Sequence, residues 1–72
     1  MNYPEFLNTR QAARYLNLSR QYLEMGRCRG YGPPYIRVNG GRAVRYHRPT
    51  LDRWMLAHQC SHGVKKVSAE DR

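Results

Sequence analysis

The side chains best suited to chemistry in this sequence directly follow Ser19. Serine is a favoured helix N-cap, because its hydroxyl accepts a backbone N–H from the next turn. Arg20 and Gln21 would then project from the first turn of a helix. An arginine fork pairs with a guanine edge, and glutamine pairs with adenine in the same bidentate manner. This order of residues therefore predicts a helix that reads base edges in a DNA groove.

The same predicted helix carries further polar and aromatic groups. Glu24, one turn beyond Arg20, could accept a hydrogen bond from a cytosine amino group or orient a neighbouring arginine. Tyr22 has two interpretations, a DNA contact or packing against a neighbouring hairpin. The whole set also has a simpler interpretation as a solvated polar face. The candidate DNA-contacting residues of this helix are Ser19, Arg20, Gln21, Tyr22, Glu24 and Arg27.

A second group of candidate residues surrounds Asn39-Gly40-Gly41, which supplies the positive φ values of a tight hairpin turn. A narrow tip with an adjacent arginine fits the minor groove, whose negative potential attracts arginine. Arginines along the strands could hold phosphates, or they could be the charged outer positions of an ordinary hairpin. The candidate DNA-contacting residues of this hairpin, which we call the wing, are Arg37, Asn39, Gly40, Gly41, Arg42 and Arg45.

The charge distribution favours a polyanionic partner. The chain has 72 residues and a formal net charge of +8. Nine arginines, no lysine and one acidic residue, Glu24, lie between Arg10 and Arg48. A solubilising surface would more often use lysine, whereas the guanidinium fork suits phosphate and guanine edges. Thr9 and Arg10 are also predicted as phosphate contacts, and a solvated basic face is the alternative.

Two short helices must position the first group. One is expected at residues 10–16, with Thr9 as its N-cap and with small or apolar residues at helical spacing. The other is expected from residue 20 to about residue 28, weakened by Gly26 and ended by Gly30. Two capped helices joined by a tight turn are typical of a helix-turn-helix, whose second helix lies in the major groove.

The following residues predict a hairpin. Residues 31–34 form a Pro- and Gly-rich extended connector, and strands with alternating polarity are expected at 35–38 and 42–46. One face of the hairpin is expected to hold Ile36, Val38, Val44 and Tyr46, and the other Arg37 and Arg45.

A third helix is expected to begin at Pro49. Its apolar stripe would consist of Leu51, Trp54, Met55 and Ala57 or His58, with Trp54 in the core. Residues 1–60 are therefore predicted to form one α+β domain, a small winged helix-turn-helix. Residues 61–72 are polar and aperiodic, and we expect a disordered tail there.

Other chemistry has little support in the sequence. Cys28 and Cys60 are far apart, which indicates free thiols in a reducing, cytoplasmic setting, where a DNA-binding protein would associate with the nucleoid. His58, Cys60 and His62 make a poor structural zinc site. No catalytic triad, carboxylate pair or phosphate-binding loop is recognisable, so we expect no enzyme activity, metal or cofactor. No apolar run is long enough to cross a membrane, so we expect no membrane partner.

Several short motifs occur in a specific order: Thr9-Arg-Gln-Ala-Ala-Arg-Tyr-Leu16, Leu18-Ser19, Gly32-Pro-Pro-Tyr35, Val44-Arg-Tyr46 and Leu51-Asp-x-Trp54. Over residues 5 to about 58 the chain thereby resembles the excisionase and AlpA-like family, which are MerR-related winged helix-turn-helix proteins of phages and mobile elements. It departs from that pattern at Pro49-Thr50, where an acidic residue or serine is usual, and at Gly26 in the recognition helix.

The resemblance implies a recombination directionality factor, which binds and bends attachment-site DNA and directs an integrase toward excision. The close alternative is a small AlpA-type transcriptional regulator at a promoter, and the distant one is a basic RNA-binding protein. The expected partners are double-stranded DNA and a site-specific integrase. Because one small module reads only a few base pairs, we also expect further copies of the chain on adjacent DNA sites.

Overall fold

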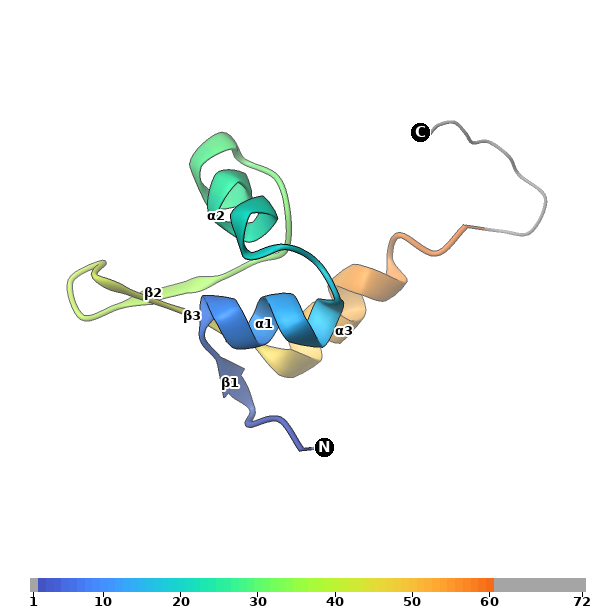
Figure 1. Ribbon diagram of the computed structural model, residues 1–72, viewed down its shortest axis with the longest axis horizontal. Helices are drawn as coiled ribbons and strands as arrows, with labels where there is room; N and C mark the ends of the chain where they lie inside the picture. Colours follow the sequence, from blue (N-terminus) through green and yellow to red (C-terminus); the bar gives the residue numbers. More distant parts are fainter. Residues whose placement is uncertain (1, 61–72) are drawn as a thin grey trace.

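Side chains at the turns decide where the first two helices begin and end. In the computed structural model, which describes residues 2–60, helix α1 spans Thr9–Leu16 and helix α2 spans Arg20–Arg29 (Figure 1). Ser19 caps α2 as predicted, since its Oγ accepts the backbone N–H three residues later at 3.0 Å. Gly30 ends α2 in the left-handed conformation, with a φ of 87°, also as predicted.

The cap of α1 is Asn8, and the prediction of Thr9 was wrong. The Asn8 Oδ1 accepts the backbone N–H of Gln11 at 2.8 Å, and the Gln11 Oε1 accepts the backbone N–H of Asn8 at 2.9 Å. This reciprocal capping box gives partners to two helix-end amides. Thr9 could not form it, because the residue three positions after Thr9 is Ala12.

Gly26 lies within α2 without ending it, and the helix continues to Arg29. A Cβ at this position would lie 2.4 Å from the carbonyl oxygen of Tyr31. The Gly26 carbonyl oxygen also accepts the backbone N–H groups of Gly30 and Tyr31, at 2.8 and 3.0 Å. Glycine at residue 26 therefore lets the connector after α2 fold back closely against the helix.

The strands form an antiparallel sheet in the order β1-β3-β2. They are β1 (Phe6–Leu7), β2 (Ile36–Val38) and β3 (Ala43–His47). The sequence did not predict β1, a two-residue strand that pairs with the end of β3. The predicted turn is present, since residues 39, 40 and 41 have φ values of 57°, 66° and 88°.

The register of the hairpin contradicts the predicted faces. Val38 pairs with Ala43, so four residues form the turn, including Arg42, which was expected in the strand. A register shift of one residue moves one strand's side chains to the other face relative to its partner. The outer face of the sheet holds Phe6, Ile36, Val38, Ala43, Arg45 and His47, and the inner face holds Leu7, Arg37, Val44 and Tyr46. The predicted grouping of four apolar residues opposite two arginines was therefore wrong.

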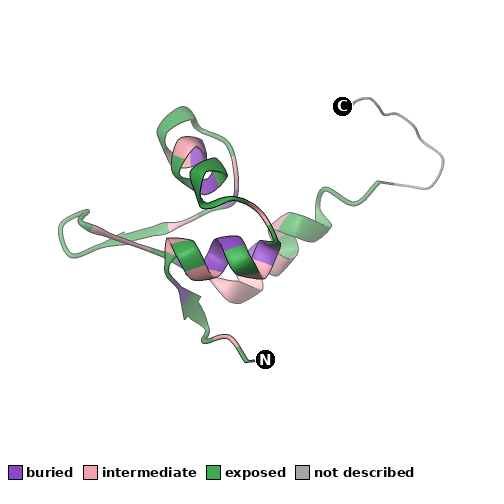
Figure 2. Ribbon diagram, viewed as in Figure 1, coloured by how far each residue is buried: buried purple, intermediate pink, exposed green. Residues whose placement is uncertain are grey.

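The core lies between the inner face of the sheet and the helices (Figure 2). Helix α3 (Arg48–Leu56) closes it and begins one residue before the predicted Pro49. Trp54 packs against the core but is only half-buried. The other residues expected at the end of the apolar stripe of α3, Met55 and Ala57 or His58, are exposed. The fully or largely buried apolar residues are Leu7, Ala12, Ala13, Leu16, Leu23, Tyr46 and Leu51.

No helix within residues 2–60 is long and apolar enough to span a membrane. The predicted tail at 61–72, including His62 of the weak metal motif, lies outside the described residues. Within the described residues, no group of three or more His, Cys, Asp and Glu side chains is arranged to hold a metal ion.

Candidate nucleic-acid interface

An arginine-lined groove lies where the start of α1, α2 and the wing approach one another, while the tip of the wing extends beyond the helices at one end of the molecule (Figure 1). Five arginines and one glutamate line this groove, so its surface is strongly positive. The lining residues are Asn8, Thr9, Arg10, Arg20, Glu24, Arg27, Arg42, Ala43, Val44 and Arg45. The fold thus brings together the predicted phosphate contacts, half of the predicted helix contacts and two of the predicted wing contacts.

Helix α2 presents Arg20 and Glu24 on one face, because residues four apart are neighbours on a helix. The Arg20 Nε lies 3.6 Å from the Glu24 Oε2, and the two side chains are 59% and 50% exposed. Leu23 lies on the adjoining side of the helix, where it is buried in the core and anchors α2. Since so exposed an ion pair contributes little to stability, Arg20 can exchange Glu24 for a ligand at small cost.

Arg27 is bound into the fold, although its sequence position suggested a DNA contact. Its Nη1 donates hydrogen bonds to the Tyr46 Oη at 2.8 Å and to the Thr9 Oγ1 at 3.2 Å. The guanidinium carbon also lies 5.9 Å from the centre of the Tyr35 ring. Because Tyr46 is fully buried in β3 and Thr9 begins α1, Arg27 ties α2 to both elements. These partners lie 18 and 19 residues away, so no local pattern could have indicated the bonds.

Gln21 and Tyr22 occupy other sides of α2. Gln21 is exposed and does not line the groove. The Tyr22 ring packs against Tyr31, with centroids 5.2 Å apart, so it contacts the connector rather than the wing. Of the two interpretations, the one in which Tyr22 packs within the protein is met by the connector and not by the wing, and 36% of this residue stays exposed.

The wing contributes unequally to the groove. Arg42 and Arg45 line it, and the tip residues 39–41 are exposed. Arg37 lies apart: its Nη1 donates to the Gly41 carbonyl oxygen at 3.4 Å, and its guanidinium carbon is 5.4 Å from the centre of the Tyr35 ring. The four-residue turn explains the difference, because it places Arg37 and Arg45 on opposite faces.

Asn8 is the polar groove residue that sequence reasoning missed. Gln11, three residues later, was the available signal, since Asn followed by Gln at that spacing is compatible with a capping box. Comparison of the chain with protein-family models and with curated proteins finds no match. The positive charge of the groove suits an anionic ligand.

Proposed function

We propose that this chain binds double-stranded DNA as a small winged helix-turn-helix protein. One observation carries the proposal: five arginines from the start of α1, from α2 and from the wing converge on one groove. Duplex DNA is a dense array of phosphates, and arginines spread over three elements can follow it. The major groove also admits an α-helix, and α2 presents its first turn beside this groove.

Within the proposal, each element has its own task. Arg20 and Gln21 contact base edges from the start of α2. Arg10 and Arg45 bind phosphates on either side of that helix, which positions the protein without reading the sequence. Arg42, at the end of the turn, lies in the adjacent minor groove. Arg27 holds α2 against α1 and β3, so that these contacts keep one geometry.

The biological role that we propose is that of an excisionase, which binds and bends attachment-site DNA and directs an integrase toward excision of a mobile element. The ordered motifs between Thr9 and Trp54 support this role through their resemblance to the excisionase and AlpA-like family. One helix reads only a few base pairs, so copies bound side by side would supply the missing specificity. Regulation of a promoter uses the same groove and differs only in where the sites lie.

Binding tests can separate base reading from simple charge attraction. Arg20→Ala and Gln21→Ala are expected to cost about 1–3 kcal/mol on the selected site and little on random duplexes. Arg14→Ala is the matched control for Arg20→Ala, because Arg14 is an exposed arginine of α1 that does not line the groove. Equal losses for Arg20→Ala and Arg14→Ala on both duplexes would contradict the proposed recognition helix.

Selection of bound genomic fragments then decides the biological role. Sites clustered at an attachment site support excision, and sites confined to promoters would assign regulation instead. Gel shifts on one, two and three adjacent sites test whether copies bind cooperatively. Competition between duplex DNA and RNA of equal length completes the test, because a preference for RNA would contradict the proposal that the chain binds DNA.

A further inference from the structure

The outer face of the sheet carries apolar side chains that the other described residues leave partly exposed. Phe6, Ile36 and Val38 are 51%, 39% and 42% exposed, whereas Leu7 and Tyr46 on the inner face are fully buried. Scattered exposed apolar residues are ordinary, but three on one face of a small sheet form a patch that favours contact with a partner.

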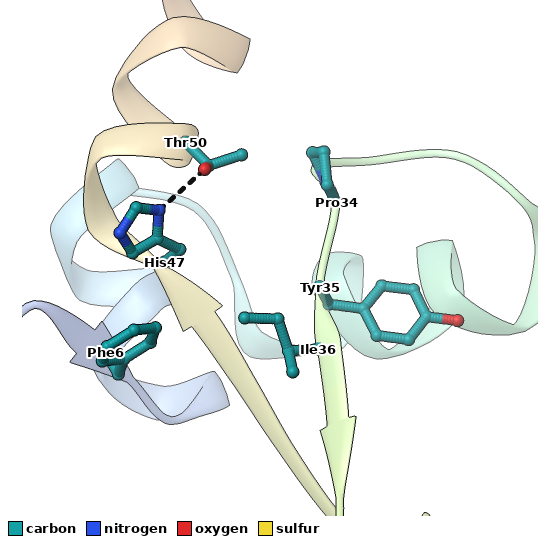
Figure 3. Close-up of a pocket in the computed structure, with 6 residues that line it drawn as sticks. All are labelled: Phe6, Pro34, Tyr35, Ile36, His47 and Thr50. Carbon is teal, nitrogen blue, oxygen red and sulfur yellow. Dashed lines mark hydrogen bonds between the residues drawn. The ribbon is translucent and has the colours of Figure 1, made fainter.

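Part of this face is hollowed into a pocket of about 350 Å³, within the range of ligand-binding cavities. Its lining residues are Phe6, Pro34, Tyr35, Ile36, His47 and Thr50. In Figure 3, Phe6, Ile36, Pro34 and the His47–Thr50 pair surround the hollow, while the ring of Tyr35 points away from it. The pocket therefore has room for a single large side chain.

Polar groups in the pocket already have partners. The His47 Nδ1 lies 2.9 Å from the Thr50 Oγ1, and the His47 Nε2 lies 2.9 Å from the Glu5 Oε2. The Phe6 ring packs beside the imidazole, with centroids 5.1 Å apart. The pocket thus offers mainly apolar and aromatic surface, which an aromatic or branched aliphatic side chain would match.

The charges around the pocket are mostly positive. Arg45 is the cross-strand partner of Ile36 on the same face, and Arg53 donates a hydrogen bond to the Thr50 Oγ1 at 3.1 Å. Among these contacts of the described residues, the acidic side chain is that of Glu5, which is already paired with His47. An occupant with acidic residues on either side of its apolar anchor would complement this rim.

We propose that the outer face binds an extended acidic segment of a partner protein, with one large apolar side chain in the pocket. β2 has a neighbouring strand on one side only, so an extended peptide could pair with its free edge. A second copy fits poorly, because two such faces would oppose their arginines. Three exposed apolar residues and a six-residue pocket are also far fewer than the roughly 20–30 residues a side of a stable dimer interface. None of the six pocket residues lines the arginine-lined groove, so the apolar anchor does not depend on the proposed DNA binding, although Arg45 borders both surfaces.

The test uses the full-length chain and twelve-residue synthetic peptides. A central Trp, Leu or Ala is flanked by Glu, by Lys or by Ser, and binding is followed by two-dimensional amide NMR. The proposal expects the Trp and Leu peptides flanked by Glu to bind, with shifts at Phe6, Ile36, His47 and Thr50. Shifts confined to the groove residues Arg10, Arg20 and Arg42 would overturn it, because the peptide would then be acting as a phosphate mimic.

Matched variants complete the test. Phe6→Ser and Arg53→Glu are each expected to weaken peptide binding about tenfold, since they remove the anchor contact and reverse the rim charge. Leu56→Ser, at an apolar residue with 64% exposure, and Arg14→Glu are the controls and should leave binding unchanged. Thermal melts monitor folding, and Ile36→Thr, which keeps a β-branched strand residue, replaces Phe6→Ser if that variant unfolds. Equal losses in variants and controls would refute the site. So would displacement by a peptide of residues 61–72, or concentration-dependent dimers that Phe6→Ser abolishes, since the occupant would then be the chain itself.

Discussion

Replacing Arg27 should lower the free energy of unfolding more than replacing any exposed arginine. Arg27→Met keeps most of the side-chain length and removes the guanidinium that donates to Tyr46 and Thr9. Tyr46 is completely buried, so its hydroxyl would lose the Arg27 donor in a place that water does not readily reach. A buried polar group without its partner is costly, whereas an exposed arginine loses little when it is replaced.

The size of the effect follows from these contacts. Hydrogen bonds that involve a charged group contribute about 1.5–3 kcal/mol, so we expect Arg27→Met to lower the free energy of unfolding by about 2–3 kcal/mol. Domains of this size rarely have more than ~3–5 kcal/mol in total, so about half of the stability is at stake. At ~4–8 °C per kcal/mol, the melting temperature should fall by about 8–24 °C. Arg20→Met should change the free energy of unfolding by less than about 0.5 kcal/mol, because its ion pair is exposed.

Urea and thermal unfolding of four proteins would measure this: the parent, Arg27→Met, Tyr46→Phe and the double variant. We expect a coupling energy of at least about 1 kcal/mol between the two residues. We also expect Arg20→Met to weaken binding to the selected DNA site and to leave the melting temperature unchanged. A fully stable Arg27→Met protein with weak DNA binding would refute the structural role and restore Arg27 as a direct contact.

The remaining predictions concern alkaline stability, the helix glycine and salt. The hydrogen bond from Tyr15 to Asp52, with burial next in importance, raises the pKa of Tyr15. The protonated phenol is therefore the form that the fold favours, and its contribution is complete below the ordinary tyrosine pKa and lost as pH rises through the raised value. Tyr15→Phe should thus cost about 1 kcal/mol at pH 7 and progressively less in strongly alkaline urea melts; a constant difference would contradict the bond's role. Gly26→Ala should destabilise by about 1–3 kcal/mol in urea melts, because its Cβ would meet the Tyr31 carbonyl; a gain of about 1 kcal/mol, as in an open helix, would contradict this. The slope of log K against log salt for one bound copy should be about −3.6, because Arg10, Arg20, Arg42 and Arg45 bring four positive charges to the DNA and release counterions; a slope near −8 would mean that all nine arginines between Arg10 and Arg48 do so.

Local chemistry explains which elements the sequence could predict. Ser19 and Gly30 mark the two ends of α2, because a hydroxyl cap and a left-handed glycine act on their own backbone neighbours. The turn at 39–41 was predictable for the same reason. The hairpin register was not, since three-residue and four-residue turns both suit this segment and the choice reverses the relation of Arg37 to Arg45.

Contacts between distant residues explain what the sequence could not predict. The groove requires Arg10, Arg20 and Arg42 to meet, and only the packing of α1, α2 and the wing brings them together. Gly26 illustrates the same limit, because a glycine inside a helix indicates local weakness, while its close approach to Tyr31 is visible only in three dimensions. The candidate residues were therefore predictable by type, but which of them bond within the fold and which stay exposed in the groove was not.

The arginines that bond within the fold change how the net charge of the chain should be interpreted. A net charge of +8 suggests a broad phosphate-binding surface, yet several arginines are bound to the protein itself. Arg27 is bonded to Tyr46, Arg37 to the Gly41 carbonyl, and Arg48 to the Pro4 carbonyl. A core of seven buried apolar residues among those described is small, and Arg27 and Arg48 join segments that apolar packing alone would hold loosely. The same residue type thus occurs in two environments in one short chain. Arg27 is bonded to a buried hydroxyl and holds α2 in place, whereas Arg20 has only an exposed partner and stays available to DNA under the proposed function.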